Sequence, residues 1–189
     1  MLDDLVLHRM VEAPVGPFPL VEAAFSWRAR RPSQWRQIDH RSAVHRVSRI
    51  PHKQLANRFA RLLYMLTIPN VVDDHVEVPT GDYQRVLRAF GASLRLVSRA
   101  FGDRFDLAAR TDIAVALWRA GMLATGSRIN DQEIMLSLAD PRMAHLLVDA
   151  AHALELSVHS RRQHRVLHLS SRRDIRKLVA LTSGLAPVP

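Results

Sequence analysis

The sequence predicts an α+β fold built from two tandem modules that form a pseudo-two-fold saddle, with an extra N-terminal segment. Two observations indicate this fold. The first is a helical stripe of small and apolar residues, LWRAGMLATGS over residues 117–127, with a weaker counterpart, FARLLYMLTIP, that begins at Phe59. The second is the pattern after each stripe, where a hairpin, another amphipathic helix and a second hairpin follow in the same order.

The two stripes are divergent copies of one pattern. Met65 matches Met122 at an offset of 57 residues, and Leu87 matches Leu147 at an offset of 60. Turn insertions account for this drift, and two copies of so long a period favour a pseudo-symmetric domain over a repeat array. We therefore expect four parts: a basic extension over 1–50, a first module over 51–109, a second module over 110–184 and a tail over 185–189.

Composition excludes several classes of protein. The chain has 189 residues and 48% hydrophobic content, enough for one domain with a real core. It has no cysteine, which excludes disulfides, thiolate metal ligands and cysteine nucleophiles. The sequence shows no bilayer-length apolar run and no signal-peptide pattern, so we expect a cytoplasmic, nucleoid-associated protein without a membrane partner.

The positive charge is the strongest indication of a partner. The formal net charge is +9, and arginine supplies nearly all of the excess, with Lys53 and Lys177 the only lysines. Basic residues are concentrated in two segments. Residues 26–61 contain ten basic residues and one acidic residue, Asp39, and residues 161–177 contain seven basic residues and one acidic residue, Asp174. Guanidinium groups suit bidentate recognition of phosphate. The clusters indicate nucleic acid, although solvated arginine-rich faces are the alternative.

The N-terminal segment has two interpretations. A short amphipathic stretch over 2–11 precedes prolines that are expected to break any helix, at positions 14, 17 and 19. Trp27 and Trp35 then lie among arginines. They either belong to a basic arm that stacks on bases, or cover an edge of the core.

The first module is expected to begin near His52. A buried helical stripe contains Leu55, Phe59, Leu62, Leu63 and Leu66. A hairpin over 71–78 should turn Val76 and Val78 inward, and Thr80 should cap a helix through Phe90. Residues 93–99 alternate as a strand would, with a return strand over 104–107.

The second module repeats this order more clearly. Thr111 should cap a helix that ends at Gly126, and Ile134, Leu136 and Leu138 should form the inward face of a strand. Asp140-Pro141 is a strong helix start. A hairpin over 156–159 and 165–169 should precede a closing helix, capped by Ser171 with Asp174 and ended by Gly184.

A sheet covered by helices on one face leaves its other face open, and this face is where we place the nucleic-acid contacts. In the first module the candidates are Arg95, Arg99 and Arg104. In the second module they are His159, Arg161, Arg162, His164, His168, Arg172 and Arg173. The N-terminal segment adds Arg28, Arg30 and Arg31.

The stretches ALWRAGMLATGSRIN, DPRMAHLLVDAAHALELSV and HRVLHLSSRRDIRKLVALTSG resemble, in order and spacing, the N-terminal LAGLIDADG homing-endonuclease-like domain of the WhiA family of bacterial transcription regulators. The resemblance covers residues 110–184 and is weaker over 52–109. It implies a saddle that sits on duplex DNA, and central helices that cross at Ala120, Gly121 and Ala124. The family's C-terminal helix-turn-helix has no counterpart before Pro189.

The resemblance also places the catalytic positions. Active homing nucleases carry one acidic residue near the end of each central helix, and those positions here are Thr125 and Ile68. Neither supplies the carboxylate that Mg²⁺ needs. His159, His164 and His168 have no acidic or cysteine partner in the pattern, so no metal, no cofactor and no small-molecule substrate is expected.

The sequence therefore predicts a non-catalytic DNA-binding protein of the transcription-regulator type. The alternatives are a protein–protein interaction module, whose N-terminal segment docks on a partner, and a subunit of an RNA-containing complex.

Overall fold

The computed structural model describes residues 2–29, 44–49, 53–68, 71–72, 75–102, 105–125, 128–130, 132–161 and 165–184. The helices are α1 (Leu2–Glu12), α2 (Pro19–Ala29), α3 (Lys53–Tyr64), α4 (Thr80–Ala100), α5 (Leu107–Ala124), α6 (Pro141–Ala153) and α7 (Arg172–Ser183). The strands are β1 (Val44–Arg49), β2 (Val71–Val72), β3 (His75–Pro79), β4 (Arg128–Ile129), β5 (Ile134–Ser137), β6 (His159–Arg161) and β7 (Val166–Leu169).

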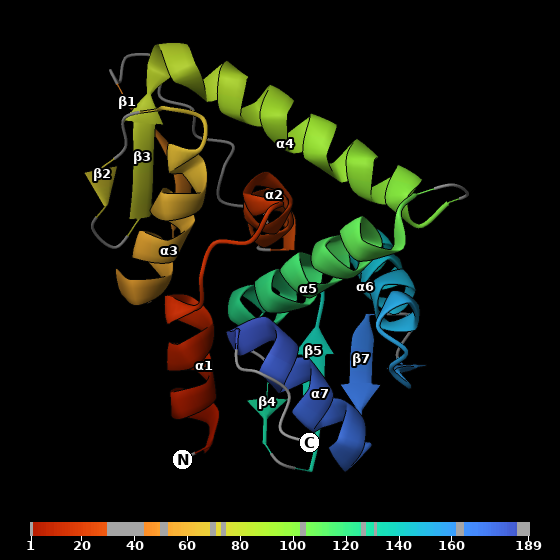
Figure 1. The fold of residues 1–189 in the computed structure, drawn as a ribbon. Helices are drawn as coiled ribbons and strands as arrows, with labels where there is room; N and C mark the ends of the chain where they lie inside the picture. Colours follow the sequence, from red (N-terminus) through yellow and green to blue (C-terminus); the bar gives the residue numbers. More distant parts are fainter. Residues whose placement is uncertain are drawn as a thin grey trace.

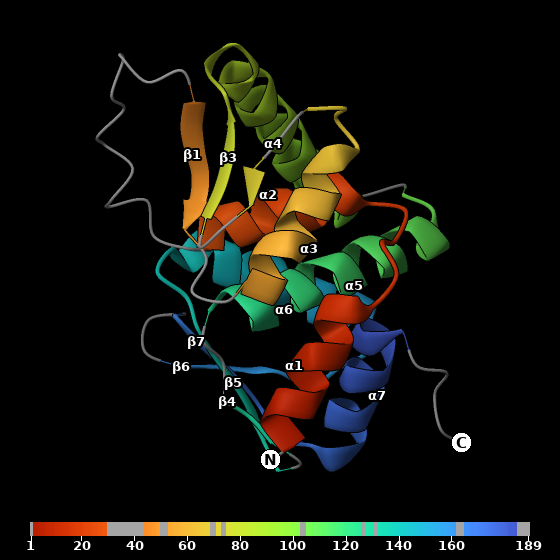
Figure 2. The same cartoon turned by 90° about the vertical axis from the view of Figure 1, so that its left-hand side faces the viewer.

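The strands form two separate antiparallel sheets. One sheet has the order β1-β3-β2, and the other has the order β4-β5-β7-β6. Helix α5 crosses the middle of the molecule, with α4 on one side of it and the four-stranded sheet on the other (Figures 1 and 2). Helix α2 packs between α4 and α5. The mixed α+β architecture that the sequence predicts is confirmed.

Each sheet has its own hydrophobic cluster. The larger cluster lies beneath the four-stranded sheet and contains the fully buried Phe25 and Trp118. The smaller cluster joins α3 and α4 to the three-stranded sheet, where Val76 and Val78 are both buried as predicted. Helices α1 and α2 contribute side chains to these clusters, so both helices pack on the folded core.

The helices with clear capping signals begin and end where the sequence predicts. The Asp140 carboxylate accepts a hydrogen bond from the Arg142 backbone N–H at 3.0 Å, at the start of α6. The Ser171 hydroxyl oxygen accepts one from the Asp174 N–H at the start of α7. Gly184 ends α7 in the left-handed region, at φ 70°, which a side chain would disfavour.

The second hairpin predicted for the first module is wrong. Residues 93–99 belong to α4, and Leu107, at the end of the predicted return strand, starts α5. Ser93 and Val97 continue the buried stripe of Val86 and Phe90 at helical spacing. The apolar pattern of a seven-residue segment fits a strand and a helix about equally well. Packing of this segment against α2 favours the helix.

Three predicted starts are displaced. Helix α5 begins at Leu107, capped by the Asp106 side chain rather than by Thr111. The Thr111 hydroxyl instead donates to the Leu107 carbonyl, inside the helix. Thr80 is the first helical residue of α4, after Pro79. Strand β6 begins at His159, later than the predicted hairpin arm at 156.

The N-terminal segment contains a helix that the prolines concealed. Pro19 is the first residue of α2, where proline is tolerated because its missing N–H has no helical partner. Trp27 packs on Phe90, with ring centroids 5.5 Å apart, so the core-edge interpretation is confirmed for Trp27. Trp35 and the basic arm around it lie outside the described residues. Strand β1, inside the predicted extension, pairs with β3, and the division into domains stays a prediction.

The predicted crossing at Gly121 is also wrong. A Cβ at Gly121 would meet Leu147 of α6 at 3.1 Å and Leu136 of β5 at 3.5 Å. Gly121 therefore lets α5 approach α6 and the four-stranded sheet, while α2 packs along α5 elsewhere.

A buried ionic cluster joins five segments of the chain. The Arg58 guanidinium donates to both carboxylate oxygens of Glu22, at 2.5 and 3.1 Å, and to the backbone carbonyls of Val11 and Ala13. Arg119 donates to Glu22 at 3.2 Å and to the Thr182 carbonyl. Burial lowers the pKa of Arg119 and the nearby Arg58 charge adds to this, while Glu22 opposes both. The cluster ties α2 to α3, α5 and α7.

Candidate nucleic-acid interface

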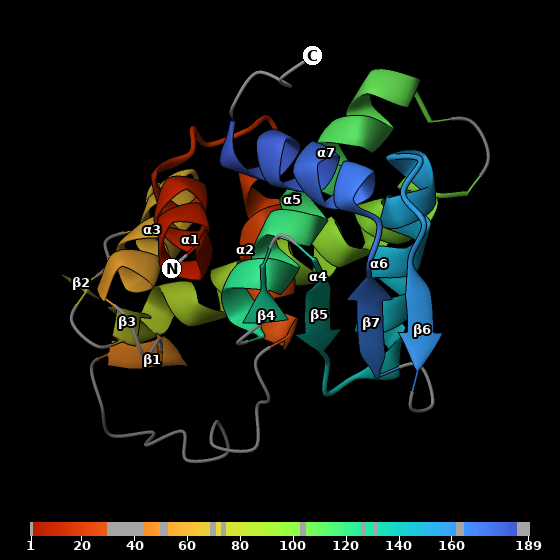
Figure 3. The same cartoon turned by 90° about the horizontal axis from the view of Figure 1, so that it is seen from below.

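The open face of the four-stranded sheet carries a row of polar and cationic side chains. The strand register aligns one residue from each strand, because Arg128 pairs with Met135, Met135 with His168, and His168 with His159. Directly paired residues project from the same face of a sheet. The residues between them, such as Leu136 and Leu167, are buried, so this row faces away from the core. Helices α5 and α7 lie on the other side of the four-stranded sheet (Figure 3).

A second row lies beside the first. Ser137 pairs with Val166, and Val166 pairs with Arg161. Arg161 and Ser137 are exposed, and Val166 is half-buried. Together the two rows form what we call the sheet face, defined by residues 128, 135, 137, 159, 161, 166 and 168. It is a strip about four strands wide, or roughly 15 Å, since neighbouring strands lie about 4.8 Å apart.

One acidic residue lies against the sheet face. The Glu133 carboxylate is 3.2 Å from His168 Nε2 and 3.6 Å from an Arg128 guanidinium nitrogen. Arg128 is 66% exposed, so its pair with Glu133 is a weak surface contact that a phosphate can replace. Arg161 has no carboxylate partner among the described residues. The sheet face is therefore cationic, with one neutralising group at its β4–β5 edge.

The structure brings some of the predicted site residues together. His159, Arg161 and His168 share the sheet face. Arg172 and Arg173 are exposed on the first turn of α7, and Arg172 Nε donates to Gln132 at 3.2 Å. A further group lies outside the described residues: Arg30, Arg31, Arg104, Arg162 and His164.

Three predicted residues lie away from the sheet face. Arg28 Nη2 lies 3.2 Å from the Asp140 carboxylate and holds the end of α2 against the start of α6. Arg95 and Arg99 are exposed on α4, and their placement on an open sheet face is wrong because residues 93–99 are helical. Helix α4 lies across α5 from the four-stranded sheet (Figure 1).

Arg128 and Met135 were missed by sequence reasoning. The alternation that turns Ile134 and Leu136 inward already places Met135 on the outer face. Arg128 precedes the buried Ile129, so the same rule turns it outward. The alternation was present in the sequence, but β4 has only two residues and is too short to be recognised as a strand from its own pattern.

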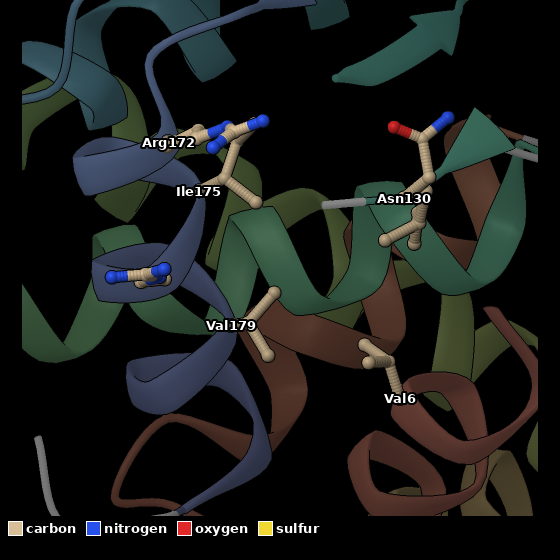
Figure 4. A pocket seen from close by; sticks show the side chains of 7 residues that line it. Val6, Asn130, Arg172, Ile175 and Val179 are labelled. Carbon is tan, nitrogen blue, oxygen red and sulfur yellow. The ribbon is translucent and has the colours of Figure 1, made fainter. Parts of the chain in front are cut away.

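A pocket of about 200 Å³ opens between α1, β4 and α7. Val6, Ile175 and Val179 point into it, while Arg172 and Asn130 lie on opposite sides of its mouth (Figure 4). Among the described residues that line it, none carries a carboxylate, imidazole or hydroxyl. The pocket therefore offers space and three polar side chains, those of Asn130, Arg172 and Arg176.

The predicted nuclease positions carry non-acidic side chains in structural roles. The Thr125 hydroxyl donates to the Gly121 carbonyl at 2.9 Å, at the end of α5. Ile68 is buried in the smaller hydrophobic cluster. In the described part of the chain, no three histidine, aspartate or glutamate side chains gather as a metal site would require. Over the same residues, no helix is long and apolar enough to cross a bilayer.

The two antiparallel sheets, with α2 and α5 packed against each other, form a fold that is similar to that of solved LAGLIDADG domains. One matching solved structure is the N-terminal LAGLIDADG domain of DUF199/WhiA, at a TM-score of 0.58 and 13% identity, over 95% of this chain and 91% of that chain. Full-length DUF199/WhiA from Thermatoga maritima matches at a TM-score of 0.59 and 14% identity, over 96% of this chain.

The chain spans 61% of the length of that full-length protein. No family model and no curated protein matches the sequence. At these identities the likeness shows the fold alone, and at that level the predicted resemblance is confirmed.

Proposed function

We propose that this chain is a DNA-binding domain of the transcription-regulator type that holds duplex DNA on the sheet face. The observation that carries the proposal is the alignment of Arg128, His168 and His159 across the strands, with Arg161 beside them. These side chains would contact the phosphate backbone, which supplies most of the affinity in such interfaces. The proposal is also supported by full-length DUF199/WhiA, in which a similar fold forms part of a longer chain.

The shape of the sheet face suits a duplex. The major groove is about 12 Å wide and admits a two-stranded β-ribbon. The exposed ribbon of β6 and β7 carries Arg161 and His159 on one strand and His168 on the other. Met135 and Val166 supply small apolar patches that would contact sugars or base edges. The ribbon would enter the groove while Arg128, at the opposite edge, contacts phosphate.

We also propose that the fold is a duplication, with α2 rather than α3 as the counterpart of α5. The sheet order β1-β3-β2 matches β5-β7-β6, and α3 and α6 occupy the same place in the two sequences of elements. Helices α2 and α5 pack together, and both contain Trp-Arg-Ala, at 27–29 and 118–120. The two sheets would then form the two sides of a saddle.

Nuclease activity is not part of the proposed function. Thr125, at the end of α5, offers no carboxylate where the resemblance places one metal ligand. With α2 as the counterpart of α5, the second ligand position would follow α2 and not lie at Ile68. Without such ligands a divalent cation would have no fixed position next to the scissile phosphate.

Fluorescence anisotropy with a random-sequence duplex, at two salt concentrations, tests the proposed function. Affinity should fall steeply as salt rises, by roughly a factor of four for each phosphate contact between 50 and 200 mM. Absent or salt-independent binding contradicts the proposal. Displacement by structured RNA at far lower concentration than by duplex DNA would instead favour a ribonucleoprotein subunit.

Replacing Glu133 with glutamine is expected to tighten duplex binding several-fold. The substitution removes the only described carboxylate next to Arg128 and His168 and leaves the shape of the sheet face unchanged. The same titration measures the effect, with Glu155→Gln as the control, because Glu155 is 87% exposed and lies after α6. Equal affinity of both variants would show that Glu133 does not lie near bound DNA.

A protein-binding role is the second candidate. Tyr64 and Met65 are adjacent at the end of α3 and are 73% and 60% exposed. Exposed aromatic and methionine side chains are typical of interface anchors. The predicted partner surface included Trp27, but Trp27 is packed on Phe90. We therefore place the partner surface at Tyr64 and Met65 instead. Loss of partner capture on Tyr64→Ser with intact duplex binding would separate this role from the first.

A further inference from the structure

Helix α4 carries a narrow stripe of arginines on its exposed side. Four exposed residues form it, which we call the α4 stripe: Arg85, Arg88, Arg95 and Arg99. At about 100° per residue, their positions fall within a sector of about 80° around the helix axis. The buried side chains of α4, such as Val86, Phe90 and Val97, occupy the opposite sector.

Little negative charge offsets the α4 stripe. Asp82 is the only acidic residue in the 21 residues of α4, and its carboxylate lies 3.9 Å from Arg85. Among the described residues, no carboxylate pairs with Arg88, Arg95 or Arg99. The stripe also lacks an apolar anchor, because its exposed neighbours are small or polar, as at Ala92 and Gln84.

The α4 stripe points away from the sheet face. Helix α4 and the four-stranded sheet lie on opposite sides of α5 in both views (Figures 1 and 2). The buried side of α4 packs on α2, so its arginines face outward from the far side of the molecule. The α4 stripe is therefore a surface separate from the sheet face.

We propose that the α4 stripe is a second phosphate-binding surface, so that one chain bridges two segments of duplex DNA. This inference rests on the proposed function, because the first segment would occupy the sheet face. Arg85 and Arg99 are separated by about 21 Å along the helix, a length over which duplex DNA carries about twelve charges. Guanidinium groups bind phosphate bidentately, which suits this arrangement.

Duplex DNA fits the α4 stripe better than an acidic protein does. Stable protein interfaces are built around buried aromatic or apolar anchors, and the stripe has none. Binding to a phosphate backbone needs only positioned positive charge, since the release of counterions supplies the free energy.

Capture of a fluorescent duplex by a second duplex fixed on beads tests the inference. The full chain should capture the fluorescent duplex, and Arg88→Ala/Arg95→Ala/Arg99→Ala should reduce capture at least tenfold. The affinity of the same variant for a single short duplex should change less than about threefold. Arg9→Ala/Arg61→Ala/Arg142→Ala removes the same charge from other exposed positions and should capture normally.

Several results would overturn the inference. Binding of a single duplex without capture of a second would reject it and leave the proposed function intact. Capture that occurs only at concentrations where the chain sediments as a dimer would reject a bridge made by one chain. Displacement of the captured duplex by polyglutamate more readily than by free duplex would indicate an acidic protein partner. Loss of single-duplex binding in the α4 variant, with retention in Arg128→Ala/Arg161→Ala, would reject the proposed function as well.

Discussion

Glu22→Ala should cost about 3–5 kcal/mol of unfolding free energy, the range for removing one partner of a buried ion pair. Glu22, Arg58 and Arg119 are each at least 95% buried, and the carboxylate is the one described negative charge between the two guanidinium groups. Without it, two like charges would remain inside the protein without compensation. A domain of this size has a total stability of about 5–15 kcal/mol, so the variant should be close to unfolding at 37 °C.

Urea unfolding followed by circular dichroism measures this effect. Glu12→Ala is the matched control, because Glu12 is exposed at the end of α1 and its loss should change stability by less than about 0.5 kcal/mol. Replacing all three residues of the cluster with methionine should recover only part of the loss. The buried charges are removed together, but the Val11, Ala13 and Thr182 carbonyls lose their donors. If Glu22→Ala is as stable as Glu12→Ala, Glu22 does not form a buried ion pair with Arg58 and Arg119.

Arg128→Ala/Arg161→Ala should weaken duplex binding by roughly 50-fold at 0.1 M salt. Each phosphate contact that releases a counterion contributes a factor of about eight at this ionic strength. The two arginines lie at opposite edges of the sheet face, so their loss removes both ends of the contact. Neither side chain is buried, and the fold should keep its stability.

Anisotropy titration against the same duplex measures the loss. Arg9→Ala/Arg61→Ala is the control, because both arginines are exposed on α1 and α3 and the variant has the same net charge. A purely nonspecific attraction to a basic protein would weaken equally in both variants. Equal affinities would therefore reject the sheet face as the contact surface.

The elements that could be predicted from the sequence are those with both a periodic apolar pattern and a local end signal. Helix α6 has Asp140-Pro141 at its start, and α7 has Ser171 and Gly184 at its ends. Both helices were predicted because a helix cap is formed by residues that are close together in the sequence. The inward face of β5 was predicted for a similar reason, because alternation fixes the buried face.

The elements that were missed depend on contacts between distant segments. Residues 93–99 alternate well enough for a strand, and only their burial against α2 makes them helical. Helix α2 itself was concealed by three prolines, of which Pro19 occupies the one helical position that tolerates it. The composition of the sheet face follows from cross-strand register, which brings Arg128 and His159 into one row from 31 residues apart.

Photo-crosslinking from position 135 shows directly whether bound duplex DNA lies on the sheet face. Met135 lies in the middle of the sheet face and is 36% exposed, so a benzophenone side chain placed there would project outward. We expect a crosslink to bound duplex DNA from position 135 and none from position 64, where Tyr64 is 73% exposed at the end of α3. A crosslink from position 64 with none from position 135 would place the DNA on another surface and reject the sheet face as its binding site.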